Sequence, residues 1–435
     1  MRRMSWVAGV AVAGALMTAC SGSGEDSGGA ATGTGKRTGS SPSTEPTPPG
    51  TQLEVPALYD TGRGWESAEE GTQVPLPRTG AVAVIQERPG EGGPDEYSLI
   101  VLDAATGEKR WSSVAVSPLG PTDLPVIRAM VDGKEYLAAW SSGTTEADAV
   151  NRGKEVVALD IFPADSSGDG VQPVHVEVEG TGKVRDGGAG LLVADDGDDT
   201  VVAVDPATGD TTDYVVNDQE PPADCPDCSS SWEVRGLTDN GLLMGTSIDI
   251  DYDAFWVPGG WTAADLRPKE ADPEESPIVQ AISDDLLVVD WGEARNSDSI
   301  VWSAVDGASG KTLATVRCDG DVTPIDAHLS ANGRYLAHGG RVFDLKAGTG
   351  VCYERTESTN PVEFQIATDE GVIYGNADTS DGFTSAGGPV QLDMRTGKIK
   401  EFDDVNTEFP FGDTAGYGLF WDEATQTMVA YPHAE

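Results

Sequence analysis

The sequence is poor in basic residues and in histidine. Lysine and arginine together number 28, against 73 aspartates and glutamates, which gives a formal net charge of −45, and the histidines number 4. Nucleic-acid phosphates are bound by clustered lysine and arginine, so this composition argues against a nucleic-acid partner. The excess of acid serves either solubility or the binding of a cation or a basic partner.

The apolar stretch near the N-terminus is too short to cross a bilayer. It runs from Trp6 to Leu16, about half the length that a membrane-spanning helix needs, and it follows Arg2 and Arg3. Small residues then lead to Cys20, an order that is typical of an export signal and resembles the lipobox of bacterial lipoproteins. The resemblance implies that residues 1–19 are a signal peptide and that acyl chains such as palmitate anchor Cys20 at the outer face of the cell membrane. An ordinary signal peptide with a nearby cysteine is the alternative.

A segment without a capacity to fold follows Cys20. Residues 21–52 are almost entirely Ser, Gly, Thr, Pro and Ala, and such a composition buries too little apolar surface to become ordered. We therefore expect residues 20–52 to be a lipidated, disordered tether. Residues 53–435 are then the folded domain.

Helical periodicity is lacking in this folded part, whereas one short motif recurs. The motif is an apolar strand, an aspartate, a few residues, a glycine and a second strand, which is the pattern of a β-hairpin. The aspartate bonds the turn backbone and the glycine supplies a positive φ. The copies are VLDAATGEKRW from Val101, ALDIFPADSSGDG from Ala158 with a widened turn, AVDPATGDTT from Ala203, AVDGASGKTL from Ala304, VFDLKAGTG from Val342 and QLDMRTGKI from Gln391.

Further apolar strands precede these motifs and complete a repeat of four strands. Such a repeat, spaced roughly 40–60 residues apart, is the content of one β-propeller blade. We predict an all-β propeller with eight blades, or seven if the irregular unit around 234–270 is absorbed by its neighbours. The preceding strands are residues 81–85, 136–140, 191–194, 242–244, 286–289, 335–337, 372–374 and 419–421.

The two ends of the folded part complement each other. The last unit stops at residues 427–432, a third strand without an outer partner, and residues 57–65 contain an isolated Asp-Thr-Gly…Trp half of the motif. The N-terminal strand is therefore expected to complete the last blade and close the ring, which removes an open strand edge.

The repeats resemble those of quinoprotein-type β-propellers, which carry pyrroloquinoline-quinone-like repeats. VLDAATGEKRW is similar to their tryptophan-docking motif, and the resemblance implies that Trp111 wedges between adjacent blades, as does Trp65 in the N-terminal fragment. The motif is degraded elsewhere, because Asp213, Ala314 and Glu401 stand at the equivalent positions.

Four cysteines follow Cys20, an even number that suggests two disulfides in an exported protein. We predict Cys225–Cys228, which would staple a polar connector, and Cys318–Cys352, which would join the outer strands of successive units. The alternative for the first pair is a redox site, which needs a helix N-terminus that the sequence does not suggest.

Signals for catalysis are scarce. The adjacent cysteines that hold the cofactor in quinoprotein dehydrogenases are absent, and we predict neither bound pyrroloquinoline quinone nor calcium. The four histidines, His175, His328, His338 and His433, are scattered without metal-ligand or triad spacing. We therefore predict no catalytic residue and no metal site.

A binding face is expected where the longer connections gather, because long loops on a rigid scaffold often carry function. Aromatic residues lie at the loop ends of the second strands or follow the cysteine connector, and such rings commonly anchor interfaces. Packing between blades is the alternative role. The candidates are Trp140, Trp232, Trp291, Tyr374 and Trp421.

Together these features favour a lipid-anchored extracytoplasmic propeller that acts as a binding or scaffolding module at the cell envelope. Its partner would be an envelope protein or a polysaccharide. The alternatives are a quinone-dependent or carbohydrate-active enzyme and an extracellular sensor for a membrane partner.

We predict that Cys20→Ala releases the mature protein into the medium, because the substitution removes the attachment point of both acyl chains. Fractionation of cells followed by immunoblotting measures the release, and Ser21→Ala, which keeps Cys20, is the matched control. Retention of Cys20→Ala in the membrane fraction would contradict the lipid anchor.

Overall fold

The computed structural model divides the chain into two units, Met1–Glu45 and Pro46–Glu435, of which only the second is described here. The predicted signal peptide, Cys20 and nearly all of the tether lie outside the described residues. The structure describes residues 48–435 except 89–94, 121–123, 146–152, 195–198, 223–224, 226–227, 229–231, 247–253, 284, 296, 298, 320–326, 355–358, 379–386 and 405.

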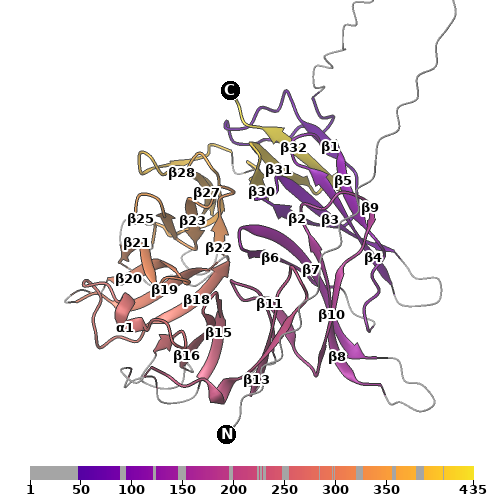
Figure 1. The fold of residues 1–435 in the computed structure, drawn as a ribbon. Coiled ribbons are helices and arrows are strands. Elements are labelled where there is room, and N and C mark those ends of the chain that lie inside the picture. The colour runs from indigo at the N-terminus through magenta and orange to yellow at the C-terminus, as the bar shows by residue number, and fades with distance from the viewer. Residues whose placement is uncertain are drawn as a thin grey trace, which may run out of the picture. The chain divides into compact units, whose positions relative to one another are not determined.

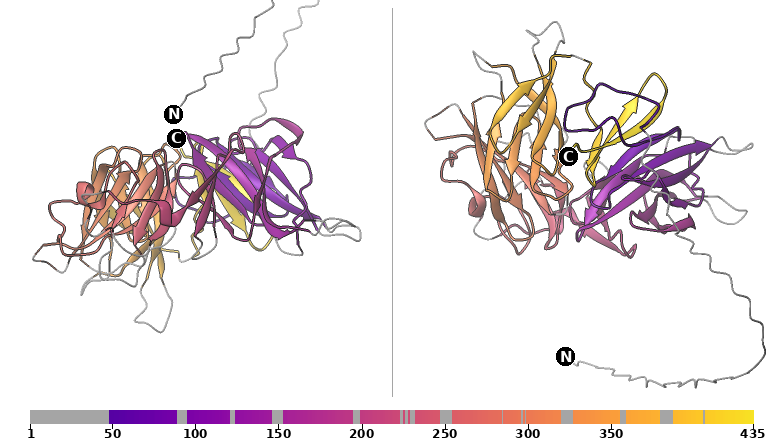
Figure 2. Two further views of the ribbon diagram at one scale, coloured as in Figure 1. Left: turned by 60° about the horizontal axis from the view of Figure 1, so that its bottom comes forward. Right: turned by 90° about the horizontal axis from the view of Figure 1, so that it is seen from above.

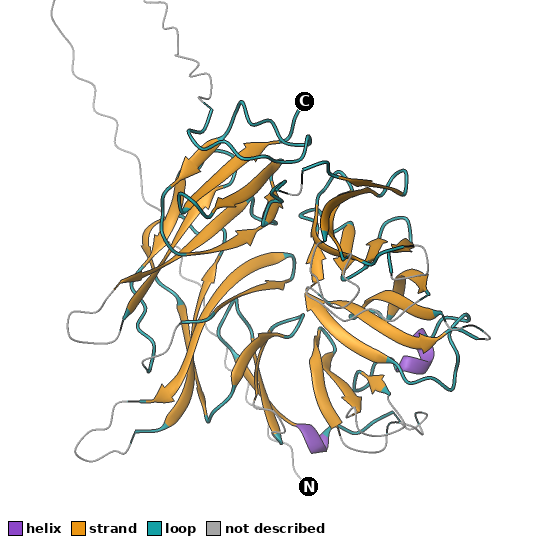
Figure 3. Ribbon diagram, turned by 180° about the vertical axis from the view of Figure 1, so that it is seen from behind, coloured by secondary structure: helices purple, strands orange, loops and turns teal. Residues whose placement is uncertain are grey.

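Almost all regular structure in the second unit is β-strand (Figure 3). The strands of the first half are β1 (Trp65–Ser67), β2 (Thr72–Leu76), β3 (Ala81–Arg88), β4 (Glu96–Asp103), β5 (Lys109–Ser113), β6 (Val126–Val131), β7 (Lys134–Thr144), β8 (Glu155–Pro163), β9 (Gly168–Val171), β10 (Val174–Glu179), β11 (Lys183–Asp186), β12 (Leu191–Ala194), β13 (Thr200–Val204), β14 (Thr211–Val215), β15 (Trp232–Thr238), β16 (Gly241–Thr246) and β17 (Phe255–Trp256).

The second half continues the same succession of strands. Two short helices, the 3₁₀ helix η1 (Val216–Asp218) and α1 (Ala263–Leu266), lie in connections. The strands are β18 (Ile278–Ser283), β19 (Leu286–Glu293), β20 (Ile300–Asp306), β21 (Lys311–Cys318), β22 (Ala327–Leu329), β23 (Tyr335–His338), β24 (Arg341–Asp344), β25 (Thr349–Cys352), β26 (Val362–Ala367), β27 (Val372–Ala377), β28 (Gly388–Asp393), β29 (Lys398–Glu401), β30 (Gly412–Thr414), β31 (Tyr417–Asp422) and β32 (Thr427–Pro432).

The strands form mainly antiparallel sheets whose first strands face a common centre, which is the arrangement of a β-propeller (Figure 1). The predicted all-β propeller is confirmed. The number of blades, eight or seven, stays a prediction, because β18–β25 form one sheet of eight strands and β15–β17 a sheet of three. The remaining sheet orders are β1-β32-β31-β30, β2-β3-β4-β5-β9, β10-β8-β7-β6, β11-β12-β13-β14 and β26-β27-β28-β29.

The recurring motif forms the predicted hairpin turn. In the copy that joins β4 to β5, Asp103 Oδ1 accepts hydrogen bonds from the backbone N–H groups of Ala105 and Thr106 at 3.0 and 2.9 Å. The Gly107 N–H donates to the Asp103 carbonyl at 2.8 Å, and the φ of Gly107 is 71°. A side chain at this φ would be strained, which is why the motif places glycine there.

Adjacent sheets are held together by docked tryptophans. Trp111 is fully buried and its indole N–H donates to the Ala164 carbonyl of the next sheet at 3.0 Å, which confirms the wedge predicted for it. Trp65 donates to the Ala104 carbonyl at 2.9 Å in the same way. Each contact therefore gives the indole N–H, fully buried in Trp111 and partly buried in Trp65, an acceptor on a neighbouring sheet.

A third docked tryptophan, Trp261, was not predicted. Its indole N–H donates to the Gly307 carbonyl at 2.8 Å. The ring also packs closely on Gly310, because a Cβ added at this glycine would lie only 2.5 Å from the ring. It follows the three-stranded sheet rather than a hairpin motif, so the repeat pattern gave no indication of its role.

The widened turn after β8 adds a strand to the neighbouring sheet. It contains β9, which pairs in parallel with β5 from Trp111↔Gly168 to Ser113↔Val171. Asp169 accepts hydrogen bonds from Lys109 Nζ at 2.6 Å and Ser112 Oγ at 3.0 Å. The insertion therefore covers an outer edge that would otherwise be open.

The last sheet is completed by the N-terminal strand, as predicted. β1 pairs with β32 in the register Trp65↔Ala430 to Ser67↔Met428, so segments from the two ends of the unit lie side by side (Figure 2). Tyr59, just upstream, is 5% exposed and forms an isolated bridge with His433. The ring is therefore closed by contacts between residues more than 350 positions apart.

Both predicted disulfides are present. Cys318 ends β21 and Cys352 ends β25, with Cα atoms 5.7 Å apart, so this bond joins the two halves of the eight-stranded sheet. Cys225 and Cys228 are three positions apart in a connector, and their Cα atoms lie 5.4 Å apart.

No helix in the part of the chain that the structure describes has the length and hydropathy needed to cross a bilayer.

We predict that deleting residues 21–66 lowers the free energy of unfolding by at least about 4 kcal/mol, whereas deleting residues 21–46 changes it little. The longer deletion removes the buried ring of Tyr59 (roughly 2 kcal/mol), the half-buried ring of Trp65 (roughly 1 kcal/mol) and the hydrogen bonds of β1 to β32 (roughly 1 kcal/mol together). Urea unfolding of the two mature forms measures the difference. Equal stabilities would contradict the closed ring.

Candidate functional site

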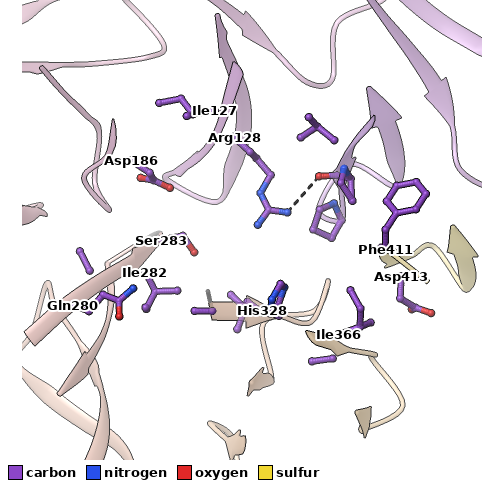
Figure 4. Close-up of a pocket in the computed structure, with 18 residues that line it drawn as sticks. Ile127, Arg128, Asp186, Gln280, Ile282, Ser283, His328, Ile366, Phe411 and Asp413 are labelled. Carbon is purple, nitrogen blue, oxygen red and sulfur yellow. Dashed lines mark hydrogen bonds between the residues drawn. The ribbon is translucent and has the colours of Figure 1, made fainter. Parts of the chain in front are cut away.

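The inner strands enclose a pocket of about 570 Å³ at the centre of the ring (Figure 4). This volume lies within the range of small-molecule sites. The lining residues belong to, or directly adjoin, seven strands: Val74, Pro75 and Pro77 (β2), Ile127 and Arg128 (β6), Asp186 (β11), Gln280, Ala281, Ile282 and Ser283 (β18), Ala327, His328 and Leu329 (β22), Ile366 and Ala367 (β26), and Phe411, Gly412 and Asp413 (β30).

One polar group of the pocket, Gln280, is held by a buried network behind it. Arg341, which is fully buried, donates from Nη1 to His338 Nδ1 at 3.0 Å, and its guanidinium carbon lies 3.3 Å from the ring centroid of Trp302. Because arginine can only donate, His338 carries its proton on Nε2 and donates to Gln280 Oε1 at 3.0 Å. Burial, assisted by the Arg341 charge, lowers the pKa of His338 to about 4, so this histidine is neutral.

A second polar group, Asp413, belongs to a cluster at the closure of the ring. Its Oδ2 accepts hydrogen bonds from His433 Nε2 and from the hydroxyl of Tyr59, both at 2.8 Å. The other ring nitrogen of His433, Nδ1, lies 3.2 Å from Glu370 Oε1. The pocket wall and the seam between the chain ends therefore share one carboxylate.

The two carboxylates keep His433 protonated. Burial alone would lower the pKa of His433, but the hydrogen bonds and charges of Asp413 and Glu370 outweigh it and raise the pKa to about 10. His433 in turn lowers the pKa of Glu370. Burial raises the pKa of Asp413 while His433 and Tyr59 oppose that shift, and the short bond between two opposite charges favours the ionised pair.

The same three side chains are the group best placed to bind a metal ion among the described residues. One ligand atom of each of Glu370, Asp413 and His433 lies within 4.8 Å of the others. However, both ring nitrogens of His433 face carboxylate oxygens, which is the geometry of an imidazolium, whereas a metal-bound histidine must be neutral. The arrangement therefore serves as an ion-paired seam.

Two of the aromatic residues predicted at a binding face are fully buried. Trp291 donates from Nε1 to Ser303 Oγ at 3.0 Å and packs within one hydrophobic cluster. Tyr374 belongs to a different cluster and stacks on Phe409 with ring centroids 5.3 Å apart. The structure does not bring these two rings together, and their contacts match the packing role that was the alternative.

Trp140 and Trp421 are partly buried, on β7 and β31, and pack against separate clusters. Trp232 begins β15 and pairs with Thr246. Of these aromatic residues, the four whose side chains the structure describes, Trp140, Trp291, Tyr374 and Trp421, do not line the central pocket. Their binding role stays a prediction, since much of the loop face, residues 89–94, 146–152 and 379–386, lies outside the described residues.

The polar residues of the pocket were missed by the sequence analysis. His328 and His433 were considered only as scattered histidines, and Arg128, Gln280 and Asp413 were not singled out. One signal was available for Arg128, since it interrupts the otherwise apolar strand Val126–Val131.

Comparison with known proteins gives neighbours at the level of fold. No protein-family model matches the chain, and no curated protein matches it.

Among solved structures, the β-propeller domain of the trilobed protease from Pyrococcus furiosus is 12% identical, with a TM-score of 0.33, and the match covers 75% of this chain and 95% of that one. The acylaminoacyl peptidase of Pyrococcus horikoshii is 12% identical, with a TM-score of 0.33, over 83% of this chain and 57% of the peptidase. Raptor of Chaetomium thermophilum is 12% identical, with a TM-score of 0.34, over 84% of this chain and 28% of that protein. At such identities the activities of these proteins do not transfer to this chain.

We predict that the stabilisation supplied by His433 is present below about pH 6.5 and is lost as the pH rises toward 10. The folded pKa of about 10 lies above the unfolded value of about 6.5, so the folded state holds an extra proton in this window. His433→Gln keeps a donor for Asp413 but removes the charge. It should lower the free energy of unfolding by on the order of 3 kcal/mol at the acidic end of the window and by much less at the basic end.

Urea unfolding across this pH range measures the effect, and His175→Gln is the matched control. His175 also contacts a carboxylate, Asp160, at 2.8 Å, but its side chain is 53% exposed, so its replacement should matter little. A loss of stability in His433→Gln that does not vary with pH would contradict the ion-paired seam.

Proposed function

We propose that the protein is a binding module of the cell envelope, anchored through Cys20, whose central pocket holds a small ligand. The observation that carries the proposal is the pocket itself, about 570 Å³ in volume and lined by side chains from seven strands of a closed scaffold. Pockets of this size with a few oriented polar groups on an apolar wall are typical of small-molecule sites.

The polar groups of the pocket are oriented before any ligand arrives. Gln280 is held by His338, and Asp413 is held by both His433 and Tyr59. Groups fixed in this way lose little conformational entropy on binding, which increases affinity. Asp413 is the one of these two groups that could exchange a proton with a substrate, and its bonds to His433 and Tyr59 occupy it, which favours binding over catalysis.

The anchor and the tether support the proposed location. The order of Arg2, Arg3, the apolar stretch and Cys20 indicates export and lipidation, and residues 21–52 would hold the propeller away from the membrane. A strongly acidic body gains little from anionic headgroups, so a covalent anchor suits it.

We predict that Ala327→Phe weakens ligand binding at least tenfold, about 1.4 kcal/mol, because the added ring occupies the pocket. The measurement is a thermal-shift screen of small organic acids, sugars and peptides on the wild type, with each hit repeated on the variant by calorimetry. The unfolding temperature of the variant without ligand verifies that it folds.

Ala424→Phe is the matched control, because it makes the same chemical change at an exposed turn between β31 and β32. It should leave binding unchanged. Hits that bind Ala327→Phe as tightly as the wild type would show that the pocket is not the site.

A further inference from the structure

Arg128 supplies a cation to the pocket with little to neutralise it. It lies on β6, and its side chain extends into the pocket toward His328 (Figure 4). Its Nη1 donates to the Pro75 carbonyl at 3.3 Å, which is the single hydrogen bond of this guanidinium within the described part of the chain. A guanidinium has five N–H donors, so most of its capacity is unused.

The carboxylates that line the pocket have other partners. Asp186 Oδ1 accepts the Gly188 N–H at 2.9 Å, and Asp413 is bonded to His433 and Tyr59. Among the described residues, no carboxylate forms an ion pair with Arg128. This differs from arginines outside the pocket, such as Arg110, which pairs with Asp103 at 2.8 Å.

One carboxyl group that interacts electrostatically with Arg128 lies behind the pocket wall. Glu135 on β7 is 2% exposed, and its Oε2 accepts hydrogen bonds from the Thr79 N–H at 2.9 Å and the Thr79 hydroxyl at 3.1 Å. Burial raises the pKa of Glu135 more than the Arg128 charge lowers it. Glu135 therefore interacts with the Arg128 charge, but among the described residues it forms no ion pair with this arginine.

A second arginine lies beside the pocket. Arg78 directly follows Pro77. Its guanidinium packs on Gly333, in the turn after β22, where an added Cβ would lie 2.6 Å from Arg78 Nη2. Its guanidinium thus reaches from the turn after β2 to the turn after β22. Two arginines thus lie in or beside the pocket of a protein with 73 acidic residues.

Part of the wall is apolar, alongside the polar side chains of Gln280, Ser283 and His328. Ile282, Ile366 and Phe411 reach the pocket from β18, β26 and the start of β30. One guanidinium edge matches a carboxylate, with two parallel hydrogen bonds. A phosphate dianion would bring twice that negative charge close to Asp186 and Asp413, which also line the pocket, so charge repulsion favours a monoanion.

We propose that the pocket binds a small organic carboxylate, with the carboxylate on Arg128 and an apolar body against Ile282, Ile366 and Phe411. This inference rests on the proposed function and assigns the chemical class of its ligand. The carboxylate would supply the acceptors that Arg128 lacks, while the apolar wall would exclude water from the ion pair.

The test compares 3-phenylpropanoate with 3-phenylpropanamide, which share one apolar body and differ in charge. Isothermal titration of the mature wild type should show at least tenfold tighter binding of the acid, as expected for hydrogen bonds between charged groups. Arg128→Gln should abolish this preference while it still binds the amide. Arg128→Lys should keep part of the preference, because it keeps the charge without the planar pair of donors.

Arg78→Gln is the matched arginine variant outside the pocket lining, and it should weaken binding of the acid less than Arg128→Gln does. Unfolding temperatures verify that each variant folds. Equal binding of acid and amide, no binding of the acid at millimolar concentrations, an unchanged preference in Arg128→Gln, or tighter binding of inorganic phosphate than of the acid would each overturn the carboxylate assignment.

Failure of the inference and failure of the proposed function give different results. A neutral ligand that binds the wild type but not Ala327→Phe would refute the carboxylate class and keep the binding pocket. Carboxylate binding that Ala327→Phe leaves unchanged would refute both.

Discussion

The pairing of β1 with β32 is the constraint on which the rest of the fold depends. It is reinforced by the hydrogen bonds of Tyr59 and His433 to Asp413 and by the docking of Trp65 on Ala104. Because Asp413 also lines the pocket, closing the ring and shaping the pocket depend on the same contacts. A protein of this architecture has no preformed site until its two ends have met.

Within the closed ring, adjacent sheets are held by contacts of two kinds. Trp65, Trp111 and Trp261 each place an indole N–H on a backbone carbonyl of the next sheet, which adds direction to otherwise non-directional packing. The Cys318–Cys352 bond adds a covalent connection between the halves of the eight-stranded sheet. A rigid frame of this kind can maintain an incompletely paired charge at its centre.

Such a charge carries a free-energy cost wherever water is excluded from it. Arg128 is half-buried, and its guanidinium has one hydrogen bond to the protein among the described residues. The chain has ample carboxylates to neutralise it, yet Asp186 and Asp413 are bonded elsewhere. This distribution is the physical basis for assigning the missing partner to a ligand.

The sequence by itself determined the features that depend on neighbouring residues: the Asp103–Gly107 type of turn, the strand order within each hairpin and the half-motif that completes the last sheet. It also indicated the two disulfides, because few pairings were available. Only the tertiary structure decided that Trp291 and Tyr374 are buried, that Trp261 docks on the next sheet, and that Arg128, Gln280 and Asp413 meet at one pocket. Turn chemistry acts over a few bonds and is visible in a short motif. The pocket instead combines side chains from strands tens to hundreds of residues apart, whose convergence is fixed by closure of the ring and by no local signal.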